Sequence, residues 1–295
     1  MTPTPAEPTV LVTPAVLRNW RLPQPRGSKH SRGHVLVAGG SPSTPGAAML
    51  AGLAALRVGA GVLALATAQS AATGTAIALP EAAVHGLAFL DGASDDGDAA
   101  RLDKLLPGQT TVLVGPGIDD PDHAERLVRA VVDAADEDAT VVLDAFALGV
   151  LPGMDGLEPL AGRTVLTPNA KEGARLLERS ADEVEDADLG ELAARIAARY
   201  GVVVSLEGSV AAPDGRCWTV DAGHPGLGTS GSGDVLAGAV AGLLARGADP
   251  AQAACWATYL HATAGDRLAS RVGRLGFLAR EIVDELPLVL VQAEA

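Results

Sequence analysis

A single aspartate follows a run of very small residues in the segment 228–244, GTSGSGDVLAGAVAGLL. A helix that begins near Ser232 would point its free N–H groups beyond the carboxyl ends of the strands, where open α/β sheets bind ligands. Gly231 and Gly233 would let the backbone approach an anion closely, and Asp234 could act as a base toward a neighbouring hydroxyl. The alternative is structural: Ser232 caps a core helix and Asp234 complements its dipole.

Two more glycine-rich loops follow apolar runs. The loop of residues 38–48, AGGSPSTPGAA, leaves one run and opens the helical segment 47–58, and the turn VGPGI of residues 114–118 ends another run. Each loop alone is as consistent with a flexible turn as with a binding loop. Three such loops at strand ends favour a ligand crevice over coincidence.

The elements that must position these loops are short strands rich in valine and leucine, separated by alanine-rich helical segments. Near-continuous apolar strands between helices are typical of a parallel sheet that is covered on both faces. The fold class is therefore predicted to be α/β. The predicted strands are residues 34–38, 61–66, 111–114, 139–144, 163–166 and 201–206.

The last third of the chain is expected to be a hairpin followed by helices. Residues 210–215 and 216–220 meet at Pro-Asp-Gly, which indicates an antiparallel hairpin at the edge of the sheet. The acidic segment 91–98, DGASDDGD, is expected to be a solvated loop. The predicted C-terminal helices are residues 234–246, 250–269 and 277–286.

Composition limits the classes of function. The 295 residues are 48% hydrophobic, with mean hydropathy +0.24 and net charge −14. We expect one domain over residues 13–291 after a flexible tail, residues 1–12. The acidic balance argues against nucleic acid and anionic membrane as partners, because both require a basic surface. With two cysteines, no secretory signal and no apolar run long enough to span a membrane, we expect a cytoplasmic protein with reduced thiols.

Several blocks of sequence occur in an order that resembles the ADP-dependent NAD(P)H-hydrate dehydratases, repair enzymes with a ribokinase-like fold. The resemblance covers about residues 13–287, and its most specific parts are the GSGD element and the YLHATAGD segment. It implies a three-layer sandwich with a mostly parallel central sheet. The blocks are residues 46–48 (GAA), 55–61 (ALRVGAG), 115–117 (GPG), 166–169 (LTPN) with Glu172, 231–238 (GSGDVLAG) and 259–266 (YLHATAGD).

The resemblance also implies a reaction and partners. The hydroxyl of the (6S)-hydrate of NADH or NADPH would be phosphorylated by ADP, with ATP as a possible substitute and Mg²⁺ as cofactor. Loss of phosphate would then restore the dihydronicotinamide, and AMP would be released. Family members commonly form tetramers. Some relatives carry a fused epimerase domain that this chain lacks, so a separate NAD(P)H-hydrate epimerase is the expected functional partner.

Roles follow residue by residue from the same resemblance. Asp234 would meet the hydroxyl of the hydrate, and Asp144 is a possible magnesium ligand through water, although it could equally cap the helix after it. The rest of the hydrate pocket would be Ala47, Gly115, Gly117 and Asn169. The nucleotide would contact Glu207, Gly208, Ser209, Val210, Ala211, Gly231, Ser232 and Gly233.

Three positions depart from the family pattern. Asn169 replaces a histidine, which keeps a polar group but removes an ionisable one. Glu207 replaces a lysine that would hold phosphates, so a nearby cation compensates, the carboxylate turns outward, or nucleotide use is impaired. Phe146 stands two residues after Asp144, where a small or acidic residue is frequent.

Two other readings stay open at this point. A ribokinase-like kinase acting on a hydroxymethylpyrimidine or a sugar would use the same cradle and aspartate to transfer phosphate without elimination. A nucleotide-binding homologue with weakened catalysis would explain Glu207 and Asn169. His261, which lies among apolar residues of a predicted helix, is expected to pack at a helix interface instead of taking part in catalysis.

Overall fold

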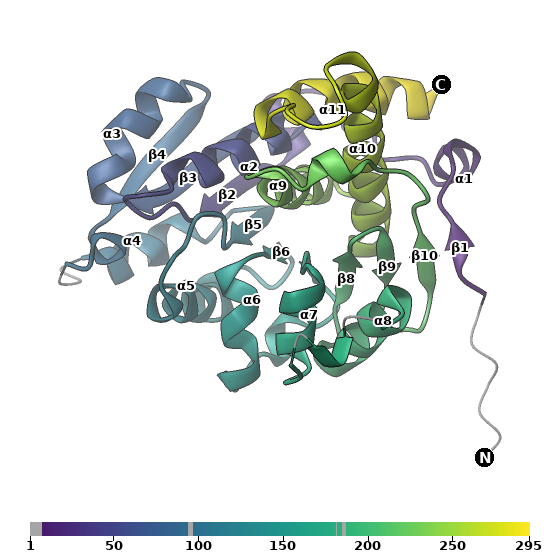
Figure 1. Cartoon of the computed structure of the whole chain (residues 1–295). Helices are drawn as coiled ribbons and strands as arrows, with labels where there is room; N and C mark the ends of the chain where they lie inside the picture. Colours follow the sequence, from purple (N-terminus) through teal and green to yellow (C-terminus); the bar gives the residue numbers. More distant parts are fainter. Residues whose placement is uncertain (1–7, 94–96, 181, 185–186) are drawn as a thin grey trace.

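The structure is a computed structural model that describes residues 8–93, 97–180, 182–184 and 187–295. In these residues ten strands form one sheet in the order β1-β10-β9-β8-β7-β6-β5-β2-β3-β4 (Figure 1). β9 runs antiparallel to β8 and β10, and the other neighbouring pairs are parallel. The strands are β1 Val10–Leu11, β2 His34–Ala38, β3 Val62–Ala68, β4 Ala82–Leu87, β5 Thr111–Val114, β6 Thr140–Leu143, β7 Thr164–Leu166, β8 Val203–Leu206, β9 Ser209–Ala211 and β10 Cys217–Thr219.

Helices cover both faces of this sheet, and a separate apolar core fills each interface (Figure 1). The predicted three-layer α/β sandwich is thus confirmed. One layer contains α1 Pro14–Asn19, α2 Pro45–Arg57, α9 Ser232–Ala245, α10 Pro250–Arg271 and α11 Ala279–Glu294. The opposite layer contains α4 Asp98–Leu105, α5 Pro121–Ala134, α6 Phe146–Val150, α7 Ala170–Leu176 and α8 Leu189–Tyr200, and α3 Gln69–Ala78 packs against β4.

Two strands of the sheet were not predicted from the sequence. The predicted tail is wrong at its end, because Val10–Leu11 form β1, which pairs in parallel with β10 and covers the outer edge of the predicted hairpin. β4 was missed because Ala82–Leu87 is only partly buried over its first four residues and does not form an apolar run. The limits of the single domain otherwise stay a prediction.

Other predicted element boundaries differ from those in the structure. The hairpin of β9 and β10 is antiparallel as predicted, and α11 runs on to Glu294 through Pro287, past the predicted end of that helix. Of the predicted acidic loop 91–98, residues 94–96 lie outside the described residues. Asp98 at its end is buried, and its Oδ2 accepts the Phe89 N–H at 2.9 Å, so this part of the loop is not solvated.

Close contact between α2 and α9 fixes the spacing of these two helices within their layer. A Cβ at Gly238 would lie 2.0 Å from the Ala51 carbonyl oxygen, and one at Gly242 would lie 2.4 Å from the Ala55 carbonyl oxygen. Only glycine therefore allows the two backbones to approach this closely. The contact fixes where the first turn of α9 lies relative to the loop that opens α2.

Candidate active site

The glycine loops after β2 and β5 meet, as expected for neighbouring parallel strands. The Gly40 N–H donates to the Pro116 carbonyl oxygen at 2.8 Å, and the Ser41 N–H donates to the Gly117 carbonyl oxygen at 2.7 Å. Gly115 has φ +131°, and a Cβ there would lie 1.9 Å from the backbone oxygen of Asp144. Any larger residue would push apart the ends of β5 and β6.

The predicted substrate residues Ala47, Gly115 and Gly117 lie in this junction. A Cβ built at Gly117 would lie 2.9 Å from the Ala47 Cβ, so these two residues are neighbours. Gly46 faces open space, since a Cβ there would meet no atom within 4 Å. The structure therefore brings together three of the predicted substrate residues beside an open position.

The first turn of α9 has an open backbone. Gly231 is the N-cap residue with φ +87° and no side-chain cap bond, and Gly233 is exposed, with no atom within 4 Å of a built Cβ. The Ser232 hydroxyl does not cap the helix but lies 2.9 Å from His261 Nε2. Within the described residues, the N–H groups of Gly233 and Asp234 reach no backbone acceptor outside the helix. This arrangement fits the anion cradle better than the structural alternative.

Two carboxylates interact at this end of the sheet. Asp144 follows β6 and is buried, and its Oδ1 accepts the Thr167 hydroxyl at 2.8 Å. Burial, and then the negative charge of Asp234, raise the pKa of Asp144 to about 7. Burial raises the pKa of Asp234 to about 6. The two acids therefore share one poorly solvated space, which is typical of functional sites.

The backbone after Asp144 is strained. Ala145 has φ +52° and ψ −126°, a conformation that costs of the order of 1–3 kcal/mol in a residue other than glycine. Ala145 is the N-cap residue of α6, and that helix has no side-chain cap bond. The alternative that Asp144 caps α6 is therefore wrong, and its carboxylate bonds to Thr167 across the strand ends instead.

Asn169 has a structural task beside its predicted role. It is the N-cap residue of α7, where its Oδ1 accepts the Glu172 N–H at 2.9 Å and Glu172 Oε2 accepts the Asn169 N–H at 2.9 Å. This reciprocal pair is a capping box. The side-chain oxygen is thus engaged, and the amide nitrogen is left as the group that could meet a ligand.

Glu207 turns its carboxylate toward α7. Its Oε1 accepts the Ala170 N–H at 2.9 Å, and its backbone lies at φ +45°. The same corner borders a hollow of about 620 Å³, which Glu207 lines together with Lys171 and Leu189. The negative charge at this position is therefore held by a backbone donor of α7.

The predicted nucleotide segment after Glu207 divides into two parts. Gly208 forms the corner with φ +92°, whereas Val210 and Ala211 are buried in β9 between β8 and β10. The side chains of these two residues are thus enclosed in the sheet, and Ser209 pairs with Leu206 and Thr219. The geometry therefore supports the predicted nucleotide contact only at this corner.

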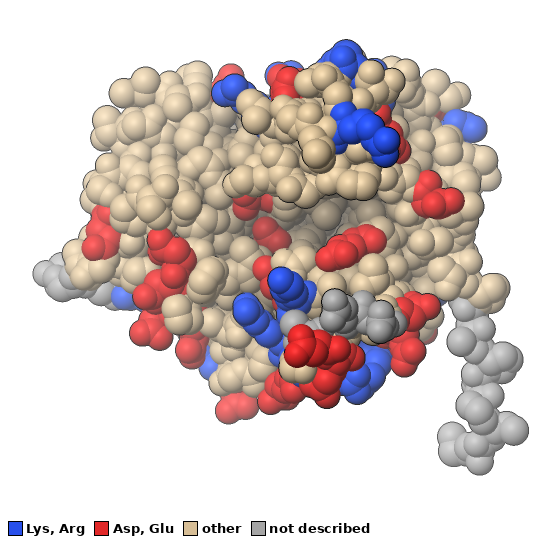
Figure 2. Space-filling view, in the orientation of Figure 1, with Lys and Arg blue, Asp and Glu red and all other residues tan. Residues whose placement is uncertain are grey.

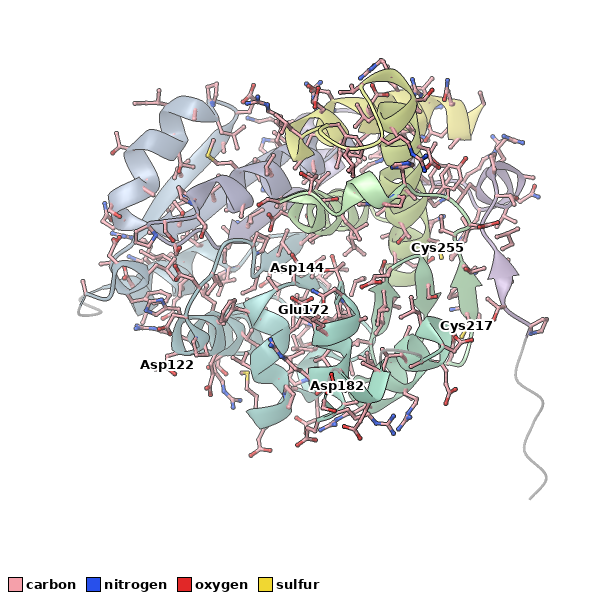
Figure 3. All side chains as sticks on the ribbon, in the orientation of Figure 1. Asp122, Asp144, Glu172, Asp182, Cys217 and Cys255 are labelled. Atoms are coloured by element: carbon pink, nitrogen blue, oxygen red, sulfur yellow. The ribbon has the colours of Figure 1, made fainter. Side chains whose placement is uncertain are left out.

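Acidic side chains border a hollow in the middle of this face, with basic side chains on its lower rim (Figure 2). Asp144 and Glu172 lie at the centre of the same view (Figure 3). Sequence reasoning gave no role to Thr167, Ala145 or Arg175. A hydroxyl directly after β7 was the available signal for Thr167, and nothing in the sequence marked the other two.

Within the described parts of the chain, no group of three or more His, Cys, Asp or Glu side chains could by itself hold a metal ion. Asp144 and Asp234 supply two neighbouring carboxylates, and Mg²⁺ is often bound by one or two carboxylates together with substrate phosphates. The residues present therefore fit a magnesium ion that arrives with a nucleotide.

None of the described helices is both long and apolar enough to cross a membrane. Cys217 and Cys255 are free thiols.

Fold and site together define a ribokinase-like α/β protein with an open helix start and two interacting carboxylates beside it. The family model described as NAD(P)H-hydrate dehydratase matches residues 35–288. The chain belongs to this family, as the sequence resemblance predicted. The match favours the dehydratase over the kinase alternative.

Relatives extend this result. The ADP-dependent (S)-NAD(P)H-hydrate dehydratase of Xanthomonas campestris is 46% identical over 95% of both chains. The bifunctional NAD(P)H-hydrate repair enzyme of Escherichia coli is 32% identical over 92% of this chain, which spans 50% of that relative. The crystal structure of the Bacillus subtilis ADP/ATP-dependent NAD(P)H-hydrate dehydratase, co-crystallised with ATP and Mg²⁺, has a TM-score of 0.81 and 29% identity, covering 98% of this chain and 100% of that one.

Proposed function

We propose that this protein catalyses the ADP-dependent dehydration of the (6S)-hydrate of NADH or NADPH, and so acts as a carbon–oxygen lyase. With ADP the products are NADH or NADPH, AMP and phosphate; ATP can replace ADP, and the nucleotide product is then ADP. Membership of the family supports the substrates. The single observation that carries the chemistry is the position of Asp234, in the open first turn of α9 and close enough to Asp144 to raise its pKa.

Asp234 accepts the proton of the hydrate hydroxyl while that oxygen attacks the β-phosphorus of ADP. The phosphorus–oxygen bond to AMP breaks, and AMP leaves. A pKa near 6 keeps Asp234 mostly ionised at neutral pH and still basic enough to take the proton. The C6–O bond of the phosphorylated hydrate then breaks with help from the ring-nitrogen lone pair, and transfer of a proton from C5 to the leaving phosphate restores the double bond. Phosphate is a far better leaving group than hydroxide.

The nucleotide phosphates bind at the N–H groups of Gly233 and Asp234, because a helix start with open backbone donors attracts anions. Ala47, Gly115, Gly117 and the Asn169 amide line the hydrate pocket. Mg²⁺ would be held by Asp144 with phosphate oxygens, and when bound it neutralises phosphate charge. Catalysis then depends mainly on positioning and charge stabilisation.

The nucleotide also contacts the corner formed by Glu207 and Gly208. Because the Glu207 carboxylate accepts the Ala170 N–H, part of its repulsion toward phosphate is offset by that donor. The adjacent hollow of about 620 Å³ is large enough for a nucleoside. The segment Ser209, Val210 and Ala211 contributes by holding this corner in the sheet.

The test is growth of the reduced-nicotinamide absorbance when purified hydrate is mixed with ADP or ATP. Asp234→Asn should lower kcat by roughly 10²- to 10⁴-fold, because Asn cannot accept the proton. Asp133→Asn, the same change at an exposed acid of α5, is the matched control and should keep the parent rate. An Asp234→Asn variant as fast as the parent would refute the catalytic role. A parent that binds ADP weakly without turnover would favour the weakened nucleotide-binding homologue.

We also propose that the protein is a cytoplasmic homotetramer that works with a separate NAD(P)H-hydrate epimerase. The doubled length of the bifunctional repair enzymes supports a second polypeptide for the second activity. The exposed apolar side chains of Leu288 and Val291 on α11 support a subunit contact. Light scattering during size-exclusion chromatography measures the mass in solution, and a monomer would contradict the tetramer.

A further inference from the structure

A second hollow lies between α6 and α7, beyond the carboxyl ends of β5, β6 and β7. Its volume is about 220 Å³, and its walls include Ala145, Phe146, Gly149, Glu172 and Arg175. In the structure α6 and α7 lie side by side (Figure 1). We call this space the α6–α7 hollow.

The α6–α7 hollow shares a wall with the candidate active site. Ala145 follows Asp144 directly, and the charge of Glu172 contributes to raising the pKa of Asp144. A molecule held at Asp234 could therefore extend past Asp144 into the hollow. The hollow is smaller than the roughly 300–1,000 Å³ typical of a complete small-molecule site, so it fits one part of a larger ligand.

The lining groups suit an aromatic base and a phosphate. The Phe146 side chain is 44% exposed, which is unusual for a phenyl ring. A Cβ at Gly149 would meet no atom within 4 Å, so this part of the wall is open. Arg175 is exposed, and among the described residues its guanidinium has no ion pair within 4.0 Å and no hydrogen bond. Aromatic side chains stack on nucleobases, and arginine is well suited to phosphate.

Glu172 is the acidic group of the hollow. Its carboxylate accepts the Asn169 N–H at 2.9 Å in the capping box. Burial raises the pKa of this carboxyl, and the Asn169 N–H and the Arg175 charge offset only part of that rise. The acid is thus tied to the start of α7. In a chain with net charge −14, Arg175 is a local cation at a place where an anionic ligand needs one.

We propose that the α6–α7 hollow binds the adenosine half of the dinucleotide hydrate, with the adenine stacked on Phe146 and a phosphate paired with Arg175. This inference rests on the proposed function, which requires only the nicotinamide half at Asp234 and leaves the rest of the dinucleotide without an assigned place. The remote half then contributes binding energy that holds the reacting half in position.

The experiment compares two substrates that differ by this half. NADPH hydrate carries it, and the hydrate of reduced nicotinamide mononucleotide lacks it. Phe146→Ala should raise KM for NADPH hydrate by about 10-fold, the range expected for loss of one stacked base. Arg175→Gln should raise the same KM. In both variants KM for ADP and KM for the mononucleotide hydrate should stay at the parent values.

Two further variants control for nonspecific effects. Phe146→Trp keeps an aromatic face and should retain a KM for NADPH hydrate close to that of the parent. Ile77→Ala removes an apolar side chain of α3 that is 77% exposed, and it should change none of the constants. Because Phe146 and Arg175 are both exposed, their replacement should leave the free energy of unfolding nearly unchanged.

Three outcomes would overturn the assignment. They are an unchanged KM for NADPH hydrate in Phe146→Ala, an equal rise for both hydrates, and a rise in KM for ADP. If the parent converts neither hydrate, the proposed function fails instead. Calorimetric binding of NADPH to the parent and to Phe146→Ala then decides the adenosine assignment alone, because it needs no turnover: equal affinity refutes it, and weaker binding by the variant supports it.

Discussion

The two ends of α9 differ in how well their buried charged side chains are compensated by partners. At the start of the helix, Asp234 and Asp144 interact in a poorly solvated space, and burial raises the pKa of both. At the end, the C-cap residue Arg246 is 8% exposed, and its guanidinium donates to the carbonyl oxygens of Val58 at 2.8 Å and Pro23 at 3.1 Å. One end holds two acids with elevated pKa values, and the other holds a cation whose donors are bonded.

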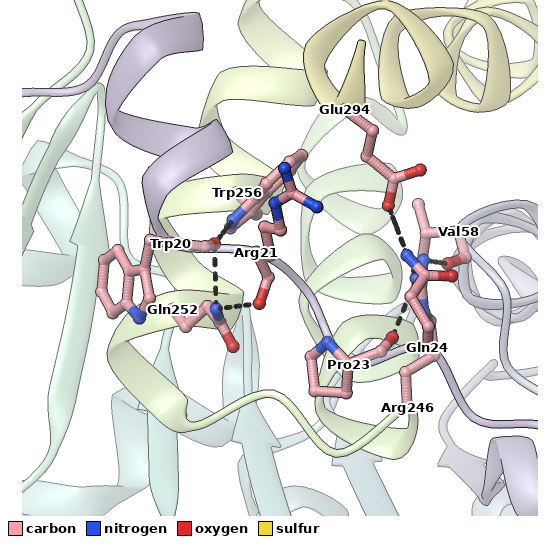
Figure 4. A network of polar contacts seen from close by, with 9 residues as sticks. All are labelled: Trp20, Arg21, Pro23, Gln24, Val58, Arg246, Gln252, Trp256 and Glu294. Carbon is pink, nitrogen blue, oxygen red and sulfur yellow. Dashed lines mark hydrogen bonds and ion pairs between the residues drawn. The ribbon is translucent and has the colours of Figure 1, made fainter.

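The network around Arg246 ties the N-terminal segment to the helical layer (Figure 4). Glu294 of α11 lies 3.7 Å from the Arg246 guanidinium and accepts the Gln24 side-chain amide at 2.9 Å. Gln252 and Trp256 of α10 both donate to the Trp20 carbonyl oxygen. Buried polar groups that bond in this way specify packing.

The difference between the two ends of α9 shows which buried charges stabilise the folded protein. A buried charged group whose donors are almost all hydrogen-bonded holds elements together, and its removal should lower the free energy of unfolding. A charge that is left uncompensated costs stability in the folded protein, and such groups persist where a ligand or substrate needs them. Removing the charge at each end of α9 should therefore have opposite effects.

Arg246→Met should give the largest change in stability. The variant leaves the buried carbonyl oxygen of Val58 and the partly buried one of Pro23 without their donor, so the free energy of unfolding should fall by about 3 kcal/mol. Turnover well below the unfolding temperature should stay at the parent value. Urea unfolding and initial rates measure the two quantities. Arg195→Met, at an exposed arginine of α8, is the control and should lie within about 0.5 kcal/mol of the parent.

Asp144→Asn should have the opposite sign and a smaller size. Because the pKa of Asp144 is raised to about 7, the folded state binds a proton between about pH 4 and 7 that the unfolded state does not bind. Ionisation of this group therefore lowers the free energy of unfolding as pH rises through that window. Asparagine does not ionise, so the variant does not lose this stability. At pH 8 the variant should be more stable than the parent, because asparagine carries no buried charge, while its turnover falls. A variant that is less stable than the parent at pH 8 would contradict this contrast.

Much of the framework was predictable because it depends on local patterns. Apolar runs bounded by glycine marked the central strands, and β2 and β5 have the predicted bounds. The glycine loops after β2 and β5 meet because neighbouring parallel strands end at one edge of a sheet. β1 was not predictable in this way, since two residues carry no periodicity and their position depends on pairing with β10.

The candidate site was predictable in where α9 begins but not in how its side chains are oriented. Asp234 and the neighbouring glycines lie in the first turn of α9, at the helix start that the motif predicted. That Glu207 turns toward the Ala170 N–H depends on how the corner after β8 packs beside α7, two elements far apart in sequence. Phe146 and Arg175 share a hollow only because α6 and α7 are neighbours. Such long-range arrangements leave no trace in local spacing.

His261 gives the smallest predicted effect and tests the buried side of the first turn of α9. The prediction that it packs at a helix interface agrees with the structure, where its Nε2 lies 2.9 Å from the Ser232 hydroxyl and 3.0 Å from the Ser232 carbonyl oxygen. Burial lowers its pKa to about 4. Between about pH 4 and 6.5 the unfolded state therefore binds a proton that the folded state does not, so this residue reduces stability as pH falls through that window.

His261→Gln should keep a polar contact with Ser232 and remove this pH dependence. At pH 7 the variant is expected to be less stable than the parent because its packing is imperfect. The difference should shrink by about 1 kcal/mol between pH 7 and pH 5.5, since only the parent loses stability through histidine. Asp144 and Asp234 titrate in both proteins, and their contributions cancel in the difference. Urea unfolding at the two pH values measures it, and a gap that stays constant would mean that His261 can be protonated in the folded protein, so that the buried side of this turn is more polar than its contacts imply.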